Sequence, residues 1–221
     1  MLIFDIETGP LSEETLRSLY QEPTYEEFAA DCDQRWKDET KRAKFEESKV
    51  NNWTKFVDRA ALSPVTGQVL AIGMRNDAGK AAILDCADEP NALANFWAKY
   101  KKAHESGSEL VGFNIAGFDV PFLVRRSWLL SVDVPATVFD PSGRYLDRIF
   151  VDLMARWQCG RREDSIKLDM LARALGVGAK PNGINGGDFH KLWKEDRPTA
   201  TAYLLNDLDM TAKCAARMGV L

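Results

Sequence analysis

The first residues of the chain alternate in the way that is typical of a buried strand. Leu2, Phe4 and Ile6 fall on one face of the extended chain, which predicts a strand over residues 1–6. An apolar run at 69–74, a turn cluster and a second run at 81–85 together predict a hairpin. Two further short strands are predicted at residues 109–113 and 149–153.

Segments with helical periodicity separate these strands. Leu93, Phe96 and Trp97 share one helix face, so residues 90–104 are expected to form a helix. Three later helices are predicted, at residues 119–130, 165–175 and 198–218. Strands that alternate with helices, together with an early hairpin, predict an α/β domain with a mixed sheet.

Residues 10–60 do not follow this alternation. They place aromatic and leucine side chains in a strongly charged background, so we expect two or three amphipathic helices inserted after the first strand. Residues 10–34 hold seven acidic residues and one arginine, whereas residues 35–59 hold eight basic and five acidic residues. Either the acidic and basic halves form a pair of solvated helices that attract each other, or the basic half lies along a phosphate-bearing strand of nucleic acid.

The length and composition of the chain fit one soluble globular domain. At 221 residues it is long enough to bury a full core, and we expect residues 1–221 to form a single domain that includes the 10–60 insertion. The net charge of −4 disfavours a protein that coats duplex nucleic acid, although a local basic groove is compatible with it. No apolar stretch is long enough to span a bilayer and the first residues have no secretory pattern, so a cytoplasmic location without a membrane partner is expected. The four cysteines are far apart, which favours reduced thiols over a disulfide framework or a zinc site.

Asp5 and Glu7 stand at the end of the first predicted strand. Residues two apart on a strand point to the same face, so both carboxylates emerge together while Ile6 packs behind them. Crowded carboxylates are tolerated where a cation lies between them. The same spacing recurs at Asp31–Asp33 and Asp207–Asp209, so taken alone it is a weak indication.

Two other segments carry candidate chemistry. Asp119 follows a predicted strand and opens a predicted helix, a position where an aspartate can serve simply as the N-cap. Tyr203 and Asp207 lie four residues apart on the last predicted helix and therefore share a face. That face would point either to solvent or into a cleft.

Considered together, the four acidic residues predict a site for hard divalent cations. They are Asp5, Glu7, Asp119 and Asp207. Carboxylate oxygens select Mg²⁺ or Mn²⁺ over zinc, and four of them can hold two ions about 4 Å apart, the arrangement used for displacement at phosphorus. Tyr203 lies one helical turn before Asp207 and would orient the attacking water, since a phenol with a pKa of about 10 is neutral.

In this order the motifs resemble those of a known nuclease family, the DEDD 3′–5′ exonucleases. The resemblance lies in three motifs: Phe4-Asp5-Ile6-Glu7-Thr8, Asn114-x-x-x-Phe118-Asp119 and Tyr203-x-x-x-Asp207. The tyrosine points to the DEDDy branch, and the second motif is most similar to that of the proofreading domain of family B DNA polymerases and its stand-alone relatives. Residues 174–180 and the glycine-rich loop after them also resemble the stand-alone group. The resemblance covers most of residues 1–7 and 65–218 and implies an RNase H-like fold, a mixed β-sheet flanked by helices.

The resemblance also implies the reaction and a role for each residue. The residues implied to be catalytic are Asp5, Glu7, Asp119, Tyr203 and Asp207. The four acids would hold two Mg²⁺ or Mn²⁺ ions, with Asp5 between them, and Tyr203 would position the nucleophile. Asn114 and Phe118 would contact the last bases of the bound strand. The implied activity is the metal-dependent release of nucleoside 5′-monophosphates from the 3′ end of single-stranded nucleic acid, with DNA favoured over RNA.

Two other functions stay open on the sequence. A catalytically silent module that binds nucleic acid or a protein partner would keep the fold and use the insertion as an interface. An endonuclease of the same fold would cut a circular single strand, which an exonuclease leaves whole. Residues 156–197, with nine basic and six acidic residues, are either a solvated surface or a groove for the strand, and Trp193 is a candidate stacking platform.

Overall fold

A computed structural model of the protein describes residues 1–161, 163–180 and 186–220. The chain divides into two compact units: Met1–Gly9 together with Gln68–Leu221, and Pro10–Gly67.

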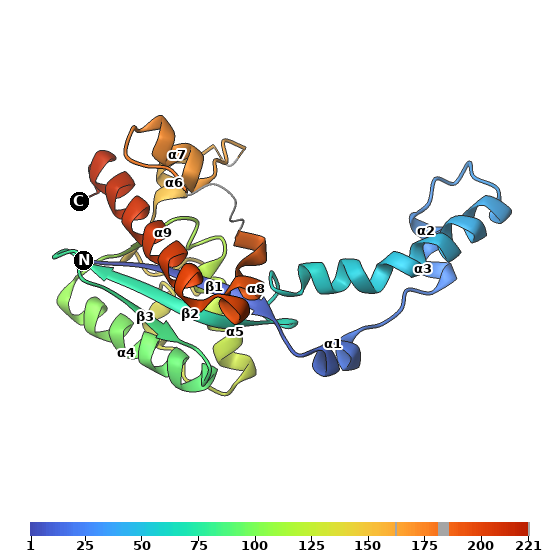
Figure 1. Cartoon of the computed structure of the whole chain (residues 1–221), viewed down its shortest axis with the longest axis horizontal. Helices are drawn as coiled ribbons and strands as arrows, with labels where there is room; N and C mark the ends of the chain where they lie inside the picture. The colour runs from blue at the N-terminus through green and yellow to red at the C-terminus, as the bar shows by residue number, and fades with distance from the viewer. Residues whose placement is uncertain (162, 181–185, 221) are drawn as a thin grey trace. The chain divides into compact units, whose positions relative to one another are not determined.

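The strands are β1 (Leu2–Pro10), β2 (Gly67–Asn76), β3 (Ala81–Asp85), β4 (Leu110–Gly112) and β5 (Phe150–Asp152). The helices of the first unit, shown in Figure 1, are α4 (Glu89–Ser106), α5 (Asp119–Leu129), α6 (Leu153–Gln158), α7 (Leu168–Ala174), α8 (Phe189–Glu195) and α9 (Arg197–Arg217). Most of the glycine-rich loop singled out in the sequence, residues 181–185, lies outside the described residues.

The first unit is built on a five-stranded mixed sheet with the strand order β3-β2-β1-β4-β5. β1, β4 and β5 run parallel, with Ile3 opposite Val111 and Val111 opposite Val151. β2 and β3 form the predicted antiparallel hairpin, in which Ile72 pairs with Leu84. The predicted α/β fold with a mixed sheet is therefore confirmed, and β1 is its central strand.

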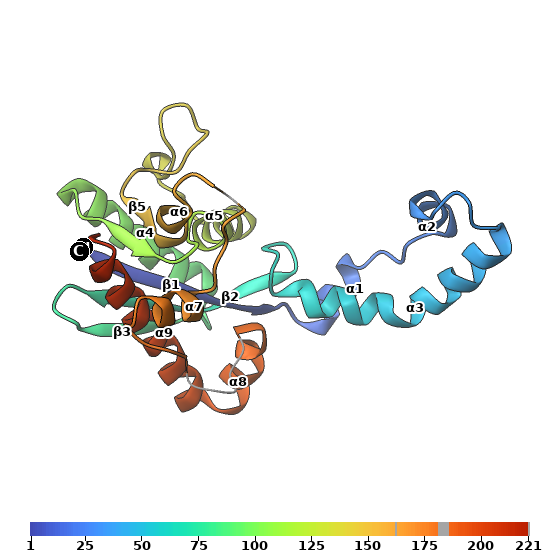
Figure 2. The same ribbon diagram turned by 90° about the horizontal axis from the view of Figure 1, so that it is seen from above.

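The side chains of β1 alternate between two hydrophobic layers. Phe4 and Ile6 belong to a core shared with α4 and α5. Ile3 belongs to a second core, which contains Leu208 of α9 together with residues of α7. Helices therefore cover both faces of the sheet, and Figures 1 and 2 show α4 and α7 on opposite sides of it. Because successive residues of a strand alternate in direction, Asp5 lies on the same side as Ile3, the side that α9 covers.

A buried ion pair fixes the position of α5. Arg126 of this helix is 5% exposed, and its guanidinium donates to both carboxylate oxygens of Glu89 on α4, at 2.9 and 2.6 Å. Glu89 Oε1 also accepts a hydrogen bond from the backbone N–H of Val69 in β2 at 2.9 Å. Removing one partner of such a pair leaves a buried charge without compensation, at a cost of about 3–5 kcal/mol. The pair thus ties α5 to both α4 and the sheet.

The turn from β4 into α5 depends on two unusual positions. A Cβ on Gly112 would lie 2.8 Å from the carbonyl oxygen of Phe4 and would collide with the side chain of Ile115, so only glycine fits. Asn114 has a φ of 62°, in the left-handed region that asparagine adopts more readily than most other residues. This tight turn starts α5 directly beside the central strand and brings Asp119 to β1.

Two short helices, α6 and α8, are not predicted by the sequence. Each is too short to show more than two turns of hydrophobic periodicity, which is the pattern that predicts a helix. The long helices are predicted closely: α9 begins one residue before the expected start. Its N-cap is Asp196, whose carboxylate accepts a hydrogen bond from the backbone N–H of Thr199 at 3.1 Å.

The residues inserted after β1 form the second compact unit, Pro10–Gly67. As predicted, this unit is helical, with α1 (Glu13–Leu19), α2 (Tyr25–Asp31) and α3 (Asp38–Ala60). It has a small aromatic interior in which the ring of Tyr20 lies 5.3 Å from that of Trp53 and 5.1 Å from that of Phe56. The two ends of the unit meet, because the N–H of Leu11 donates to the carbonyl of Thr66 at 2.9 Å.

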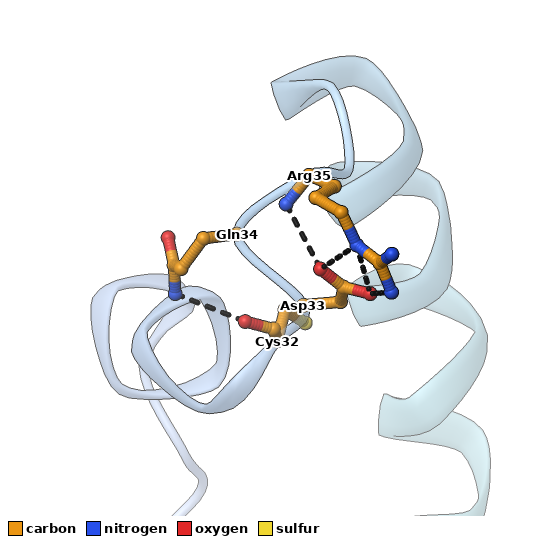
Figure 3. Close-up of polar contacts among 4 residues, drawn as sticks. All are labelled: Cys32, Asp33, Gln34 and Arg35. Atoms are coloured by element: carbon orange, nitrogen blue, oxygen red, sulfur yellow. Dashed lines mark hydrogen bonds and ion pairs between the residues drawn. The ribbon is translucent and has the colours of Figure 1, made fainter.

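The turn between α2 and α3 is held by hydrogen bonds of its own side chains (Figure 3). The carboxylate of Asp33 accepts from the backbone N–H of Arg35 at 3.0 Å and from its guanidinium at 2.6 Å. Gln34 Nε2 donates to the carbonyl of Cys32 at 2.9 Å. These bonds to Arg35 lower the pKa of Asp33, so the carboxylate of Asp33 is committed to the turn.

Within the described residues, none of the helices combines the length and apolar character that a membrane crossing requires. The four cysteines carry free thiols. Burial raises the pKa of Cys86 to about 12, so at neutral pH this thiol packs as a small apolar group.

Candidate active site

Asp5 and Glu7 lie where β1 continues past the end of β4. The parallel pairing covers Leu2 and Ile3, and β4 ends at Gly112. Both carboxylates therefore emerge beyond the edge of that pairing on the side of α9, and Glu7 is only 9% exposed. Ile6 packs into the opposite core. The predicted arrangement, two carboxylates on one face with Ile6 behind them, is the one observed.

Asp119 is the first residue of α5 and is 4% exposed. Its Oδ1 accepts a hydrogen bond from the backbone N–H of Ile6 at 3.0 Å. The N-cap position is occupied by Phe118, whose side chain makes no capping hydrogen bond. The simple capping role that the sequence allowed for Asp119 is therefore wrong, because its carboxylate reaches across to the residue between Asp5 and Glu7.

Tyr203 and Asp207 project from α9 into the protein and are 3% and 5% exposed. Lys180, in the segment that follows α7, contacts both. Its Nζ donates to the Tyr203 hydroxyl at 2.6 Å and to Asp207 Oδ2 at 2.5 Å. The polar stripe of α9 thus faces inward, and an ammonium group lies between the phenol and the carboxylate.

The carboxylates of Asp5, Glu7 and Asp207 form an arrangement that fits a divalent cation. One oxygen from each lies within 4.8 Å of the others, as judged over the described residues. Asp207 Oδ1 is buried and has no hydrogen-bond partner in the part of the chain that the structure describes, an unfavourable state that a bound ligand would relieve. Oxygen-only ligands suit Mg²⁺ or Mn²⁺. Asp119 is not part of this group of three, and its Oδ1 accepts the hydrogen bond from Ile6.

Burial raises the pKa of all four acidic side chains. The pKa values of Asp5 and Glu7 lie well above their ordinary values, first because of burial and then because of the neighbouring carboxylates. Burial raises the pKa of Asp119 to about 7. The pKa of Asp207 is also raised by burial, although the ammonium of Lys180 opposes the rise. The site thus holds more negative charge than the protein compensates, which a cation would correct.

Tyr203 is neutral and Lys180 is charged at physiological pH, because both have a pKa well above that range. Burial and the charge of Asp207 raise the pKa of Tyr203 to about 12, above the value of about 10 assumed from the sequence. The phenol is therefore neutral throughout the physiological range. Burial lowers the pKa of Lys180, but Asp207 more than offsets this and brings the pKa to about 12, so the ammonium stays charged.

A cleft of about 450 Å³ opens beside these groups. Its lining includes Asp5, Asp119 and Tyr203 as well as the two predicted substrate-contact residues, Asn114 and Phe118. The ring of Phe118 is half-buried and packs against that of Phe122, with the centroids 5.4 Å apart. The structure therefore brings the residues of all three sequence motifs to one place, across more than 200 positions of the chain.

Two residues of the site were not singled out in the sequence. Lys180 counted only as one of several nearby bases. Asp152 was not considered, yet its carboxylate accepts from the backbone N–H groups of Asn114 and Ala116, at 2.8 and 3.0 Å, and so holds the turn before α5. The available signal was the same as for Asp5, an aspartate near the end of a predicted strand.

Trp193 is not an exposed stacking platform, and that prediction is wrong. The side chain is 7% exposed, its ring lies 5.3 Å from that of Phe189, and the guanidinium of Arg197 lies 3.6 Å from its centroid. The physical reason is that α8 buries its apolar face against α9. The sequence did not predict α8 and therefore left Trp193 in a loop.

Comparisons with known proteins match this chain both to solved structures and to a family model. Among solved structures, the chain is similar to the family B DNA polymerase from the hyperthermophilic archaeon Pyrobaculum calidifontis, with a TM-score of 0.60 and 18% sequence identity. The match covers 98% of this chain and 24% of that chain, so the protein spans about a quarter of the polymerase's length. At this identity the likeness concerns the fold. No curated protein matches the sequence.

Among family models, that of the RNase H superfamily matches residues 59–208. These residues carry the second and third motifs, with Asp119, Tyr203 and Asp207, and make up more than half of the chain. The mixed sheet with helices on both faces agrees with this match and with the fold that the motifs imply. The chain therefore belongs to the RNase H superfamily and has the RNase H-like fold typical of its nucleases.

Proposed function

We propose that this protein is a metal-dependent 3′–5′ exonuclease that releases nucleoside 5′-monophosphates from single-stranded nucleic acid. The observation that carries the proposal is the convergence of oxygens from Asp5, Glu7 and Asp207 within 4.8 Å, in a cleft that Tyr203 also lines. The structural likeness to a family B DNA polymerase supports nucleic acid as the substrate and favours DNA. We infer that the matched quarter of that polymerase is its proofreading domain.

Two Mg²⁺ or Mn²⁺ ions are the proposed cofactors. Asp5, Glu7 and Asp207 would hold one ion, and Asp5 and Asp119 would hold the second. When bound, the ions would neutralise the charge that develops on the scissile phosphate and on the leaving 3′ oxygen. The unpartnered Asp207 Oδ1 and the raised pKa values of the acids support this assignment.

Tyr203 is proposed to orient the attacking water. Its hydroxyl oxygen accepts a hydrogen bond from Lys180 Nζ, and its phenolic hydrogen would be donated to the water or to a phosphate oxygen when the substrate is bound. With a pKa of about 12, the phenol orients the water and does not deprotonate it. The ammonium of Lys180 adds a fixed positive charge beside the place where negative charge would develop.

Asn114 and Phe118 are proposed to hold the last nucleotides of the strand. Both line the cleft beside Asp5. A base stacked on the ring of Phe118 would gain about 1–3 kcal/mol, a contact that tolerates any base. The backbone of Asn114 is held in its turn by a hydrogen bond from its N–H to Asp152, so no further ordering of the backbone is needed on binding.

We further propose that residues 1–221 act as one exonuclease domain in which residues 10–60 are an insertion. The bond between Leu11 and Thr66 places the two ends of the inserted unit together. Replacing residues 11–66 by a short Gly-Ser linker is therefore expected to leave the sheet folded. Cooperative unfolding of the shortened chain, followed by circular dichroism, would support the insertion. A shortened chain without a cooperative transition would contradict it.

The exonuclease proposal is tested on 5′-labelled single strands of DNA and RNA and on a circular single strand, with Mg²⁺ or Mn²⁺. We expect stepwise shortening from the 3′ end, lost on chelation and in Asp5→Ala. Asp209→Ala is the matched control, because Asp209 lies two residues from Asp207 but pairs with Lys213 at 2.7 Å. Cutting of the circle would indicate an endonuclease, and binding without any cleavage would indicate a catalytically silent module.

A further inference from the structure

We propose that a groove lined by arginines beside the catalytic cleft binds the single strand on the 5′ side of its 3′ end. This inference rests on the proposed exonuclease function and names the surface that would recognise the substrate. The residues that define this arginine groove are Arg125, Trp128, Arg144, Tyr145, Arg148 and Arg156.

The groove consists of two hollows that share a wall. The larger, of about 660 Å³, is lined by Arg144, Arg148 and Arg156. The smaller, of about 300 Å³, is lined by Arg125 and again by Arg144. Ala116, an exposed residue of the turn before α5, borders both hollows. Because they share Arg144 and Ala116, the hollows form one continuous surface.

The same turn joins the arginine groove to the catalytic cleft. Asn114 and Phe118 line the cleft, and Ala116 between them lines the groove. Asp152 accepts hydrogen bonds from the backbone N–H groups of both Asn114 and Ala116, so the turn is rigid. A strand whose last base lies against Phe118 therefore needs only to cross this turn to enter the groove.

The arginines of the groove have no acidic partner among the residues that the structure describes. Four exposed arginines form no ion pair with any residue in the described ranges: Arg125, Arg144, Arg148 and Arg156. Arg126 and Arg173, by contrast, are each paired with an acidic residue. Charges left without a partner on a chain of net charge −4 indicate a surface that attracts a polyanion.

The carboxylates in and beside the groove are engaged by hydrogen-bond donors of the protein itself. Asp147 Oδ2 accepts from the Tyr100 hydroxyl at 2.8 Å and lies 2.6 Å from His104 Nδ1. Asp152 accepts from backbone N–H groups, as described above. Asp140, at the start of the loop that carries Arg144, accepts from the backbone N–H of that arginine at 3.0 Å. These carboxylates hold the loop in place, and the arginine side chains remain available to bind phosphate groups.

Two large aromatic side chains stand exposed beside the arginines. Tyr145 is 65% exposed and Trp128 is 61% exposed, and Trp128 is steadied by stacking on Phe139 with the centroids 6.4 Å apart. Exposed rings interleaved with basic side chains are the combination that single-strand-binding grooves use, since bases stack on the rings while phosphates meet the charges. This favours a single-stranded nucleic acid as the occupant.

The groove is tested by binding, which does not depend on cleavage. Fluorescence anisotropy would follow 5′-labelled oligodeoxythymidine of about three and about twelve nucleotides, with Ca²⁺ in place of Mg²⁺ and a gel to verify that the strand stays intact. For Arg144→Ala/Arg148→Ala we expect the longer strand to bind about tenfold or more weakly. The slope of the logarithm of its binding constant against the logarithm of the salt concentration is expected to decrease by about one to two, which corresponds to the loss of one to two phosphate contacts. Binding of the short strand is expected to stay within about twofold, because it reaches only the cleft.

Matched variants distinguish the loss of binding at the groove from an effect of the protein's total charge or of misfolding. Lys213→Ala/Arg217→Ala removes two positive charges from the exposed end of α9 and is expected to bind both strands like the wild type. Arg144→Lys/Arg148→Lys is expected to recover part of the lost affinity. Thermal unfolding of each variant shows whether it is folded.

The proposal is overturned if the double alanine variant binds the long strand as the wild type does, or if it weakens the long and short strands equally. Either result leaves the exonuclease proposal standing as long as the wild type still shortens 3′ ends. If the wild type shortens no strand but the variant loses affinity only for the long one, the exonuclease function fails and the groove stands.

Discussion

Replacing Asp119 by asparagine gives a sharp test of the buried charge at the candidate site. Asparagine keeps an oxygen that can accept the hydrogen bond from the N–H of Ile6, now 3.0 Å long, but it carries no charge. Asp119 is 4% exposed, and burial raises its pKa from 3.8 to about 7. The substitution therefore removes the free-energy cost of burying a carboxylate in the metal-free protein, while the hydrogen bond to Ile6 stays in place.

The magnitude follows from the two pKa values. A carboxyl group whose pKa is raised on folding binds its proton more tightly in the folded state, so the stability of the fold decreases as pH rises toward that pKa. For a change from 3.8 to about 7, the penalty is at most roughly 2 kcal/mol at about pH 5 and roughly 4 kcal/mol at about pH 8. Without metal, Asp119→Asn is thus expected to be more stable than the wild type, by a margin that grows by about 2 kcal/mol between these pH values.

The assay is urea unfolding of the metal-free protein in a chelator, followed by circular dichroism across this pH range. Asp133→Asn is the matched control, since it makes the same change at an exposed position and is expected to shift stability little at any pH. A variant less stable than the wild type at about pH 8, or a margin that does not change with pH, would refute the reasoning. With Mn²⁺ added, the order should reverse, because only the wild type keeps its full set of ligands.

Three further predictions concern the neighbouring residues. Tyr203→Phe is expected to lower kcat on the order of tenfold to a hundredfold while calorimetry shows unchanged Mn²⁺ affinity, since we propose that the hydroxyl orients the water and does not bind the metal; loss of Mn²⁺ binding would contradict this role. Lys180→Met should tighten Mn²⁺ binding in the same titration, because the ammonium that now contacts Asp207 repels a cation; weaker binding would count against it. Gly112→Ala should lower the free energy of unfolding by about 1–3 kcal/mol or more in urea, because its Cβ would lie 2.8 Å from the carbonyl oxygen of Phe4; wild-type stability would show that the turn can relax.

Patterns within single segments predicted most of the fold. Alternation at residues 1–6 and the turn cluster between two apolar runs are local signals, and they led to β1 and to the β2–β3 hairpin. The same holds for α4 and α9, which are long enough to repeat their apolar face several times. Helices α6 and α8 escaped prediction because one or two turns carry too few positions for a period, and the error over Trp193 followed from that.

Pairs of acidic residues with the same spacing have different surroundings in the structure. Asp5 and Glu7 share one face of a strand and meet Asp207. Asp33 of the Asp31–Asp33 pair is bound by Arg35 in a turn, and Asp209 is paired with Lys213 on the surface of α9. The spacing is identical in the sequence, so the difference arises from what packs against each pair.

By itself, the sequence determined which residues are candidates for the site, the order of their motifs and the class of ion that oxygen ligands prefer. Those properties depend only on residue type and local spacing. The tertiary structure decided that Asp119 bonds to β1 instead of capping its helix, that the polar stripe of α9 faces inward, and that Lys180 contacts Tyr203 and Asp207. The physical reason is that these contacts join segments far apart in the chain, and their geometry is set by the register of the parallel strands and the packing of helices on both faces of the sheet.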